Sequence, residues 1–487
     1  MASVFAPLHN PTSDQMHNWL IGSTLVIITL LRSVAVITTP LELGVDEAQY
    51  WLWSQTPDFG YFTKPPLIAW IIGLAHWIFG HHTWAVRLPA CWIHLITALL
   101  LWRGASWLFG QQAGRLAALV WISLPASGLG SFLISTDTPL LALWSAGLLA
   151  VCGIASRRLS SPVGMSIAGL AFGAAMLAKF AAIYALIGLT LIHLHGYMTR
   201  QKLFEGRDIG IALFAFCLVA SPHIIWNFAN EFSTVRHLSD NVNISQPSSM
   251  AGVWQFIGGQ FAVAGPVVLL FMMIAAIAHW HDQKSRWLVW MSAPVLTLMI
   301  IQSYLSEANA NWAITAFPAL TILLAGWLVQ TQNQLYGFVA IGINFGLSLM
   351  IILVTIAGSM GPFTPQSDPL RRLRGWQQLA TDIAPHIATH DAAAIIADRR
   401  ATASLLSWHF YQSDLKILVH DDDSIPSNHF EANHSWSPQT GRRLIALTGG
   451  NVPPDLPGVR WLFPTSTSQS TISHNKQRQF KMYRGIE

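Results

Sequence analysis

Long apolar runs alternate with short polar stretches over the first 358 residues of the chain. Each run holds about 18 predominantly apolar residues, the length that a helix needs to cross a hydrocarbon core of about 30 Å. Because lipid offers no partners to backbone polar groups, we predict that every run is a helix. About eleven spanning segments are expected, near residues 19–39, 83–102, 113–131, 138–156, 162–178, 181–197, 208–228, 252–280, 287–305, 312–330 and 335–358.

The apolar segment at 65–80 is shorter, at about 16 residues, and too short to span a membrane. Pro66 suits the first turn of a helix. Trp70 and Trp77 are side chains of the kind that anchor at membrane–water boundaries. We therefore predict a helix that lies at the interface, within a first outer loop at 40–82.

The chain changes character after Gly358, because about half of all charged residues fall in the last quarter of the sequence. We predict a transmembrane domain at 1–358 and a soluble domain at 359–487. Strand and helix patterns alternate in the soluble part, which is typical of a small α/β domain. The pattern predicts an amphipathic helix at 368–388, buried strands at 392–398, 415–421 and 442–449, and a second helix at 404–411.

Composition agrees with a multi-spanning membrane protein. Hydrophobic residues make up 52% of the 487 residues and charged residues 10%, whereas soluble proteins carry roughly 25% charged residues. The three cysteines all lie in apolar runs, which excludes a disulfide framework and a spaced metal cluster. The net charge of +4 is spread over loops rather than gathered in one patch. We therefore expect membrane lipids as partners and no nucleic acid.

Basic residues gather in one alternating set of loops and acidic residues in the other. By the positive-inside rule, the basic loops are cytoplasmic. With an odd number of spans, the amino terminus is then cytoplasmic and the soluble domain lies outside. The basic set is Arg103, Arg115, Arg157, Arg158, Arg200, Lys202, Arg207, Lys284 and Arg286; the outer acidic set is Glu42, Asp46, Glu47, Asp58, Asp137, Glu231, Asp240 and Glu307.

The first outer loop, GVDEAQYWLWSQTPDFGYFTKPPLIAW, is the most informative stretch for chemistry. Asp46 and Tyr50 are spaced i and i+4, so they share a face of a short helix, and Asp46 can accept a proton there. The alternative is that Asp46 only caps this helix. Lys64 precedes two prolines at membrane depth, where a cation needs an anionic partner such as a lipid phosphate. Its alternative is snorkelling to ordinary headgroups.

A second candidate site is the stretch STDTPLLALW, which carries Asp137 at the outer end of a span. Pro139 suits the first turn of a helix, so Asp137 is a candidate N-cap. An ionisable residue at the edge of a membrane segment is also a functional candidate. Since Asp137 and Asp46 are expected on the same side, we predict that two carboxylates and a lysine converge there.

Several polar residues have two interpretations. Arg32 and Arg87 lie in spans and require partners. Lys179, in a short outer turn, either lines the cavity or snorkels to headgroups. The outer loop at 307–312 either holds substrate or only connects two spans. Arg236 and His237 either bind phosphate or acceptor, or lie in a solvated loop.

The motifs DEAQYW, GYFTKPPLIAW, STDTPLL, LAKF and NWAITAFPAL together resemble those of polyprenyl-phosphate-sugar glycosyltransferases of the GT-C fold. The resemblance is to the type of protein O-mannosyltransferases and lipid A aminoarabinose transferases, and it covers about residues 19–358. It implies a mainly α, polytopic membrane protein with a GT-C domain of about 11 to 13 helices and a small C-terminal α/β domain. It also implies transfer of a sugar, with inversion, from a polyprenyl phosphate to an acceptor outside the membrane.

The resemblance assigns roles to three residues. Asp46 matches the acidic residue taken to be catalytic, Asp137 matches the aspartate of the second loop, and Lys64 matches the lysine that meets the donor phosphate. The residue types fit this chemistry, because a carboxylate can take the proton of an acceptor hydroxyl and a cation can balance a leaving phosphate. The full candidate set is Asp46, Asp137 and Glu47 as catalytic residues, with Lys64, Tyr61, Tyr50, Arg236 and His237 binding donor phosphate or acceptor.

One position departs from the aminoarabinose branch of the family. That branch carries a glutamate, associated with a bound metal, immediately before the lysine, where this chain has Thr63. We therefore expect no cofactor; a divalent metal is an alternative that the sequence does not support. The sugar is expected to differ from aminoarabinose. The pattern is more similar to the branch that decorates bacterial lipopolysaccharide cores and related envelope glycans, including galacturonic acid transferases.

The sequence thus predicts an inverting glycosyltransferase of the bacterial inner membrane, with lipid A, lipopolysaccharide core or another envelope glycan or glycolipid as acceptor. Three alternatives remain. The first is a transporter or lipid flippase, which would favour internal repeats and helices broken near the midplane. The others are a protein O-mannosyltransferase and a non-catalytic assembly subunit, the last of which would tolerate loss of Asp46.

Overall fold

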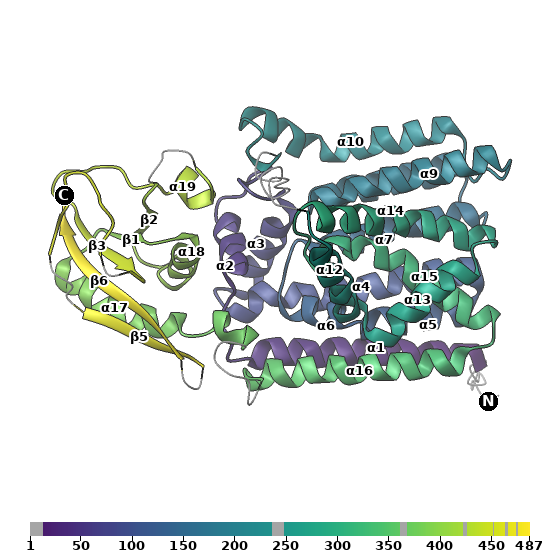
Figure 1. The fold of residues 1–487 in the computed structure, drawn as a ribbon, viewed down its shortest axis with the longest axis horizontal. Helices are drawn as coiled ribbons and strands as arrows, with labels where there is room; N and C mark the ends of the chain where they lie inside the picture. Colours follow the sequence, from purple (N-terminus) through teal and green to yellow (C-terminus); the bar gives the residue numbers. More distant parts are fainter. Residues whose placement is uncertain are drawn as a thin grey trace, which may run out of the picture.

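The structure is a computed structural model that describes residues 13–235, 248–360, 368–421, 426–450, 452–462, 466–473 and 476–487. A body of long helices lies at one end of the molecule and a smaller part with a sheet at the other (Figure 1). Two short helices, α2 (Val45–Ser54) and α3 (Leu67–Phe79), lie between these parts. The first outer loop therefore lies where the membrane part meets the C-terminal part.

The described residues include eight helices long and apolar enough to cross a membrane, each at a predicted span. A ninth predicted span forms the shorter apolar helix α8 (Ser161–Met176). The prediction of a polytopic, mainly helical membrane protein is therefore confirmed. The eight long spans are α1 (Ser13–Thr38), α4 (Thr83–Phe109), α7 (Asp137–Ala155), η1 (Phe180–Ile183) with α9 (Tyr184–Met198), α10 (Gly206–Ala229), α14 (Gln283–Leu305), η2 (Ala310–Ala316) with α15 (Phe317–Gln330), and α16 (Gln334–Ala357).

Two predicted spans are broken. Helices α5 (Gln111–Ser123) and α6 (Pro125–Phe132) meet at 55°, and α12 (Met250–Ala264) and α13 (Pro266–Ala278) meet at 104°. A proline follows each break and removes a backbone donor. In the second pair, Gly265 also has a φ of +83°, which glycine adopts without a steric penalty. Each pair was predicted as one segment, because the apolar pattern runs on through the break.

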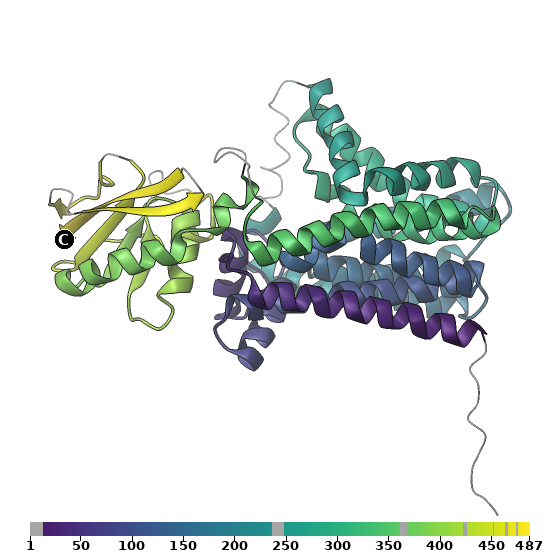
Figure 2. The ribbon, with the colours of Figure 1, turned by 90° about the horizontal axis from the view of Figure 1, so that it is seen from below.

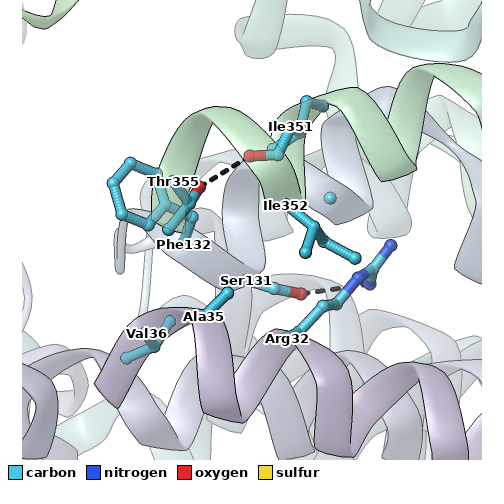
Figure 3. Close-up of a pocket in the computed structure, with 9 residues that line it drawn as sticks. Arg32, Ala35, Val36, Ser131, Phe132, Ile351, Ile352 and Thr355 are labelled. Carbon is cyan, nitrogen blue, oxygen red and sulfur yellow. Dashed lines mark hydrogen bonds between the residues drawn. The ribbon is translucent and has the colours of Figure 1, made fainter. Parts of the chain in front are cut away.

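The broken pair α5 and α6, together with Ser348 of α16, supplies the partners of Arg32, which is buried in α1. Its guanidinium donates to carbonyl and hydroxyl oxygens rather than to a carboxylate in the described chain. Figure 3 shows Arg32 reaching toward Ser131 across the gap between α1 and α6. A cation at the C-terminal end of a helix is favourable, so this arginine stabilises the break. Its acceptors are Ile122 O at 2.6 Å, Ser348 Oγ at 2.9 Å, Ser127 Oγ at 3.1 Å and Ser131 Oγ at 3.2 Å.

Small residues let helices approach closely in the membrane part. Gly169 and Gly173 of α8 lie one turn apart against α10. A Cβ atom at Gly169 would lie 2.3 Å from the carbonyl oxygen of Ala212, and one at Gly173 would lie 2.6 Å from that of Phe216. Close backbone contact of this kind is how helices associate in lipid. On another side of the body, α1 and α16 pack together along the surface seen in Figure 2.

The C-terminal part is a small α/β domain, as predicted. Its sheet has the order β2-β1-β3-β6-β4, with β5 paired to β6. The first three strands are parallel, and β6 runs antiparallel to β3, β4 and β5. The elements are η3 (Pro369–Leu373), α17 (Trp376–His390), β1 (Ala394–Ala397), α18 (Arg400–His409), β2 (Lys416–Val419), α19 (His429–Asn433), β3 (Arg443–Thr448), β4 (Arg460–Trp461), β5 (Ser466–Ser473) and β6 (Lys476–Ile486).

The first outer loop and the C-terminal domain share one hydrophobic core. Trp51 of α2 and Trp408 of α18 belong to the same buried cluster, and their rings lie 4.8 Å apart. Glu42 adds a polar contact, because its carboxylate accepts the backbone N–H groups of Gly375, Gln377 and Trp376 at 2.8, 2.8 and 2.9 Å. An anionic side chain at a helix N-terminus is stabilising. The domain is thus docked on the loop that carries the predicted site.

Candidate active site

Helix α2 carries Asp46 in its first turn and Tyr50 one turn later. The Asp46 side chain is 62% exposed, and its Oδ1 accepts a hydrogen bond of 2.8 Å from Nη2 of Arg400. Tyr50 is buried. Burial raises the pKa of Tyr50, and the charges of Asp46 and Asp137 raise it further. Tyr50 therefore lies within electrostatic reach of both candidate carboxylates.

Glu47 is adjacent to Asp46 in sequence but points into the protein. Its side chain is buried against Arg87 of α4, whose Nη2 and Nε lie 2.7 and 2.9 Å from the two carboxylate oxygens. The same carboxylate accepts the backbone N–H of Gly44 at 2.8 Å and of Ile134 at 3.2 Å. Glu47 was predicted as a catalytic residue. With both oxygens engaged in this way, its geometry fits the positioning of α2 instead.

Lys64 is held by a tight turn between α2 and α3. Tyr61 N donates to Lys64 O at 3.0 Å, and Lys64 N donates to Tyr61 O at 3.3 Å. Burial lowers the pKa of the Lys64 ammonium, and Lys179 lowers it further, whereas Asp46 and Asp137 raise it. Within the described ranges, the ammonium has no hydrogen bond or ion pair. It is a partly buried cation that feels the charges of two carboxylates and lacks a direct anionic partner among the described residues.

The Tyr61 hydroxyl is engaged by the loop itself. It donates to the carbonyl oxygen of Trp53 at 2.9 Å and accepts the N–H of Asp58 at 3.2 Å. Its ring stacks on that of Trp53 at 4.8 Å. Burial raises the pKa of Tyr61 to about 12. These contacts indicate that Tyr61 shapes the turn of Lys64; it was predicted to bind substrate.

Asp137 is the first residue of α7, so Thr136 rather than Asp137 is the N-cap of that helix. Its two oxygens accept from Nζ of Lys179 and from Nδ2 of Asn311, each at 2.7 Å. Lys179 therefore has a defined partner at the site. Asn311 comes from the polar loop at 307–312, which the sequence offered as a substrate contact or a plain connection.

A cavity of about 600 Å³ begins at Asp137 and extends among the helices. Its polar lining includes Asp137, Asn309 and Asn311, and most of its other lining is apolar. Its walls come from α4, α5, α6, α7, α12, α16 and the stretch before α15. Both broken helix pairs thus contribute to it. A cavity with mostly apolar walls and a few polar groups suits an amphiphilic ligand.

Sequence reasoning missed Arg400, and Arg236 and His237 lie outside the described residues. A signal for Arg400 was present, because it follows β1, the central strand of the parallel set, directly. Ligand-binding residues in α/β sheets gather at the carboxyl ends of such strands. In the described part of the chain, no group of three or more His, Cys, Asp or Glu residues could hold a metal. Thr63, buried next to Lys64, offers no carboxylate.

Comparison with known proteins identifies the family. The family described as dolichyl-phosphate-mannose-protein mannosyltransferase matches residues 63–226. A lipid A galacturonosyltransferase, RgtD, of Rhizobium johnstonii is 31% identical over 429 residues, which cover 87% of this chain and 89% of that protein. The chain belongs to the ArnT-like family of GT-C glycosyltransferases.

More distant members of the ArnT-like family agree with this assignment. An undecaprenyl phosphate-alpha-4-amino-4-deoxy-L-arabinose arabinosyl transferase of Pectobacterium atrosepticum is 24% identical over 57% of this chain and 51% of its own length. The crystal structure of ArnT from Cupriavidus metallidurans bound to undecaprenyl phosphate has the same fold. It matches with a TM-score of 0.66 and 14% identity over 96% of this chain and 98% of that one.

The predicted fold and enzyme class are therefore confirmed: the chain is an integral membrane glycosyltransferase. The comparisons give no support to the transporter and assembly-subunit alternatives. The family matched over 63–226 is described by protein mannosylation, whereas the relative that matches most of the chain is named for lipid A. A lipid acceptor is thus the better supported of the two.

Proposed function

We propose that this protein transfers a uronic acid from a polyprenyl phosphate to a lipid A-type glycolipid, with inversion at the anomeric carbon. The observation that carries the proposal is the environment of Lys64, a partly buried cation that feels the charges of Asp46 and Asp137 and has no direct anionic partner in the described chain. A phosphate group supplies that partner. A soluble or apolar substrate would leave the ammonium unbalanced in a desolvated place.

In the proposed reaction, Asp46 is the general base. The oxygen of the acceptor hydroxyl forms a bond to the anomeric carbon, and the hydroxyl proton passes to Asp46. The bond between the anomeric carbon and the phosphate oxygen breaks, and its electron pair leaves with the polyprenyl phosphate. The phosphate gains one negative charge, which the Lys64 ammonium stabilises. A single displacement without a covalent intermediate inverts the anomeric carbon.

The other site residues have supporting roles in this proposal. Asp137, held between Lys179 and Asn311, lines the cavity and accepts hydrogen bonds from the sugar hydroxyls. The apolar part of the cavity holds a lipid chain. Glu47 and Tyr61 keep Asp46 and Lys64 in place, and Tyr50 separates them from the core.

Two observations support a uronic acid as the sugar. The relative from Rhizobium johnstonii is named for galacturonic acid and lipid A. In this chain, Thr63 precedes Lys64, where the aminoarabinose branch carries a glutamate. An amino sugar is cationic and a uronic acid is anionic. Replacing a glutamate with a neutral threonine removes a charge that would repel the uronate carboxylate.

The proposed setting is a bacterial inner membrane, with the amino terminus in the cytoplasm and the C-terminal domain in the periplasm. The basic residues of one loop set support this orientation. The relatives that match are bacterial proteins. In this orientation, Asp46, Lys64 and Asp137 lie at the periplasmic face.

Transfer in proteoliposomes tests the proposal. The purified chain is supplied with lipid A and with one of three undecaprenyl phosphate donors, carrying galacturonic acid, an uncharged hexose or aminoarabinose. Mass spectrometry of the lipids then shows which sugar is attached. We expect lipid A to gain a uronic acid and little or none of the other sugars. Preferential gain of the hexose or of aminoarabinose would contradict the assigned sugar, and no gain with any donor would contradict the proposed reaction.

A further inference from the structure

The C-terminal domain reaches the proposed catalytic base through one residue, Arg400. This arginine begins α18, which packs on α2. Its Nη2 lies 2.8 Å from Oδ1 of Asp46, and its Nη1 lies 2.8 Å from Oε1 of Gln49. Nothing in the proposed reaction so far uses this contact. It joins the soluble domain to the atom that is to receive a proton.

The contact cannot stay as it is through the reaction. While Arg400 holds Oδ1, only the other oxygen of Asp46 is open to an acceptor hydroxyl. Once Asp46 has taken the proton, its carboxyl is neutral and Arg400 has lost its anionic partner. A guanidinium stays charged at any working pH. Its Nη2 is then available to another anion close to Asp46.

We propose that Arg400 is the acceptor-recognition residue of this enzyme: it pairs with Oδ1 of Asp46 in the free protein and passes to an anionic group of the incoming glycolipid. This inference rests on the proposed function of Asp46. The anionic group is a phosphate of the acceptor head group. Binding of the correct acceptor then frees Oδ1 of Asp46 from Arg400.

The side chain has the capacity for this exchange. A guanidinium has five N–H donors and suits planar, bidentate recognition of carboxylates and phosphates. Arg400 donates through Nη1 to Gln49 and through Nη2 to Asp46, and 36% of its side chain is exposed. Gln49 is buried, and its Nε2 has no hydrogen-bond partner among the described residues. The free protein therefore leaves donors unused at this point.

The position of Arg400 favours the acceptor over the donor. The donor phosphate has Lys64, which comes from the first outer loop, and the cavity beginning at Asp137 lies among the membrane helices. Arg400 belongs to α18 of the C-terminal domain, which lies beside α2 in Figure 1, and its contact with Asp46 comes from that domain instead. The acceptor hydroxyl must reach the same carboxylate. A charged group on the acceptor head group is then within range of a side chain that already touches Asp46.

Two acceptors and three variants test the inference. Arg400→Ala, Arg400→Lys and the control Arg399→Ala are compared with the unmodified protein in proteoliposomes. Arg399 is the neighbour of Arg400, and its ion pair is with Asp398, away from Asp46. The acceptors are lipid A and lipid A from which the phosphates have been removed. The rate of transfer, the KM for each acceptor and the KM for the donor are measured.

We expect Arg400→Ala to lower kcat/KM for phosphorylated lipid A about tenfold or more, mainly through KM, since it removes a charge-assisted bond. The loss with the dephosphorylated acceptor is expected to be smaller, and the KM for the donor to be unchanged. Arg400→Lys keeps the positive charge but not the planar guanidinium. Its kcat/KM for phosphorylated lipid A should lie between the values of Arg400→Ala and the unmodified protein. Arg399→Ala should behave as the unmodified protein.

Equal losses with both acceptors, or a raised KM for the donor, would overturn the inference. So would an Arg400→Ala protein that matches Arg399→Ala. A thermal unfolding curve for Arg400→Lys separates a folding defect from a binding defect. Loss of the inference leaves the proposed function intact, because that function is tested separately, by transfer of the uronic acid to lipid A and by the loss of transfer in Asp46→Asn.

Discussion

The charged side chains of the site differ in what holds them. Asp46 is paired with Arg400 and Asp137 with Lys179, while Lys64 has no direct partner among the described residues. The motifs single out Asp46, Lys64 and Asp137, and their convergence stays a prediction, since of the three Asp137 lines the cavity and the other two do not. The motifs were not sufficient to separate Asp46 from Glu47, because consecutive helical residues point about 100° apart. Only the packed structure shows which of them meets Arg87.

The unpartnered ammonium of Lys64 predicts how donor binding depends on pH. A lysine binds phosphate only in its charged form, and the lowered pKa of Lys64 means that this form is lost at a lower pH than for a free lysine. The affinity for undecaprenyl phosphate is therefore expected to fall as the pH rises toward that pKa. Calorimetric measurement of undecaprenyl phosphate binding at a series of pH values tests this prediction.

The matched control for this prediction is Lys64→Arg. An arginine keeps its charge throughout the accessible range, so its binding curve should be flat on the alkaline side. An identical alkaline fall in the arginine variant would mean that another group controls donor binding.

Among the helices and strands, the sequence predicted best those that are defined by the pattern of apolar residues alone. Helix α19 and strands β4 and β6 are absent from the prediction, whereas the long apolar helices, α17, α18 and the first three strands of the C-terminal domain were predicted. Strand β5 was not, because its sequence STSQSTIS carries no apolar alternation and it is held by pairing with β6. The bends at Leu124 and Gly265 were also absent from the prediction, since they interrupt the backbone and not the apolar pattern.

Glu47 connects three elements, and its loss tests that role. Glu47→Gln leaves the buried Arg87 without its counter-charge and weakens the link from α2 to α4 and to Ile134. Removing one member of a buried ion pair costs about 3–5 kcal/mol. We expect a lower unfolding temperature in detergent, followed by lower activity. An unchanged unfolding temperature with lost activity would show that Glu47 takes part in the chemistry instead.

At the scale of the whole molecule, the sequence places a boundary at 358, but the first outer loop packs with the C-terminal domain. This could not be predicted from composition, because both sides of the contact are separated by about 300 residues of membrane helices. The consequence is that the domain lies next to Asp46 and supplies Arg400.

Glu42 is the polar contact that fixes the domain at this place. Glu42→Ala removes the acceptor for the N–H groups of Gly375, Trp376 and Gln377. We expect faster hydrogen exchange at these amides and a lower transfer rate. The control is Glu431→Ala, because the Glu431 carboxylate accepts the backbone N–H of Ser427 elsewhere in the same domain. Unchanged exchange at the three amides would contradict the role of Glu42 in docking.

The most direct test of the account is the rate of sugar transfer by Asp46→Asn in proteoliposomes with saturating donor and acceptor. The substitution keeps the size of the side chain and removes its ability to take a proton. A positioned general base contributes about 10²- to 10⁴-fold, and a loss in that range is predicted, with donor binding retained. Asp391→Asn, at an exposed carboxylate of the C-terminal domain, should keep full activity. An Asp46→Asn protein that transfers sugar at nearly the unmodified rate would contradict the assignment of Asp46 as the base.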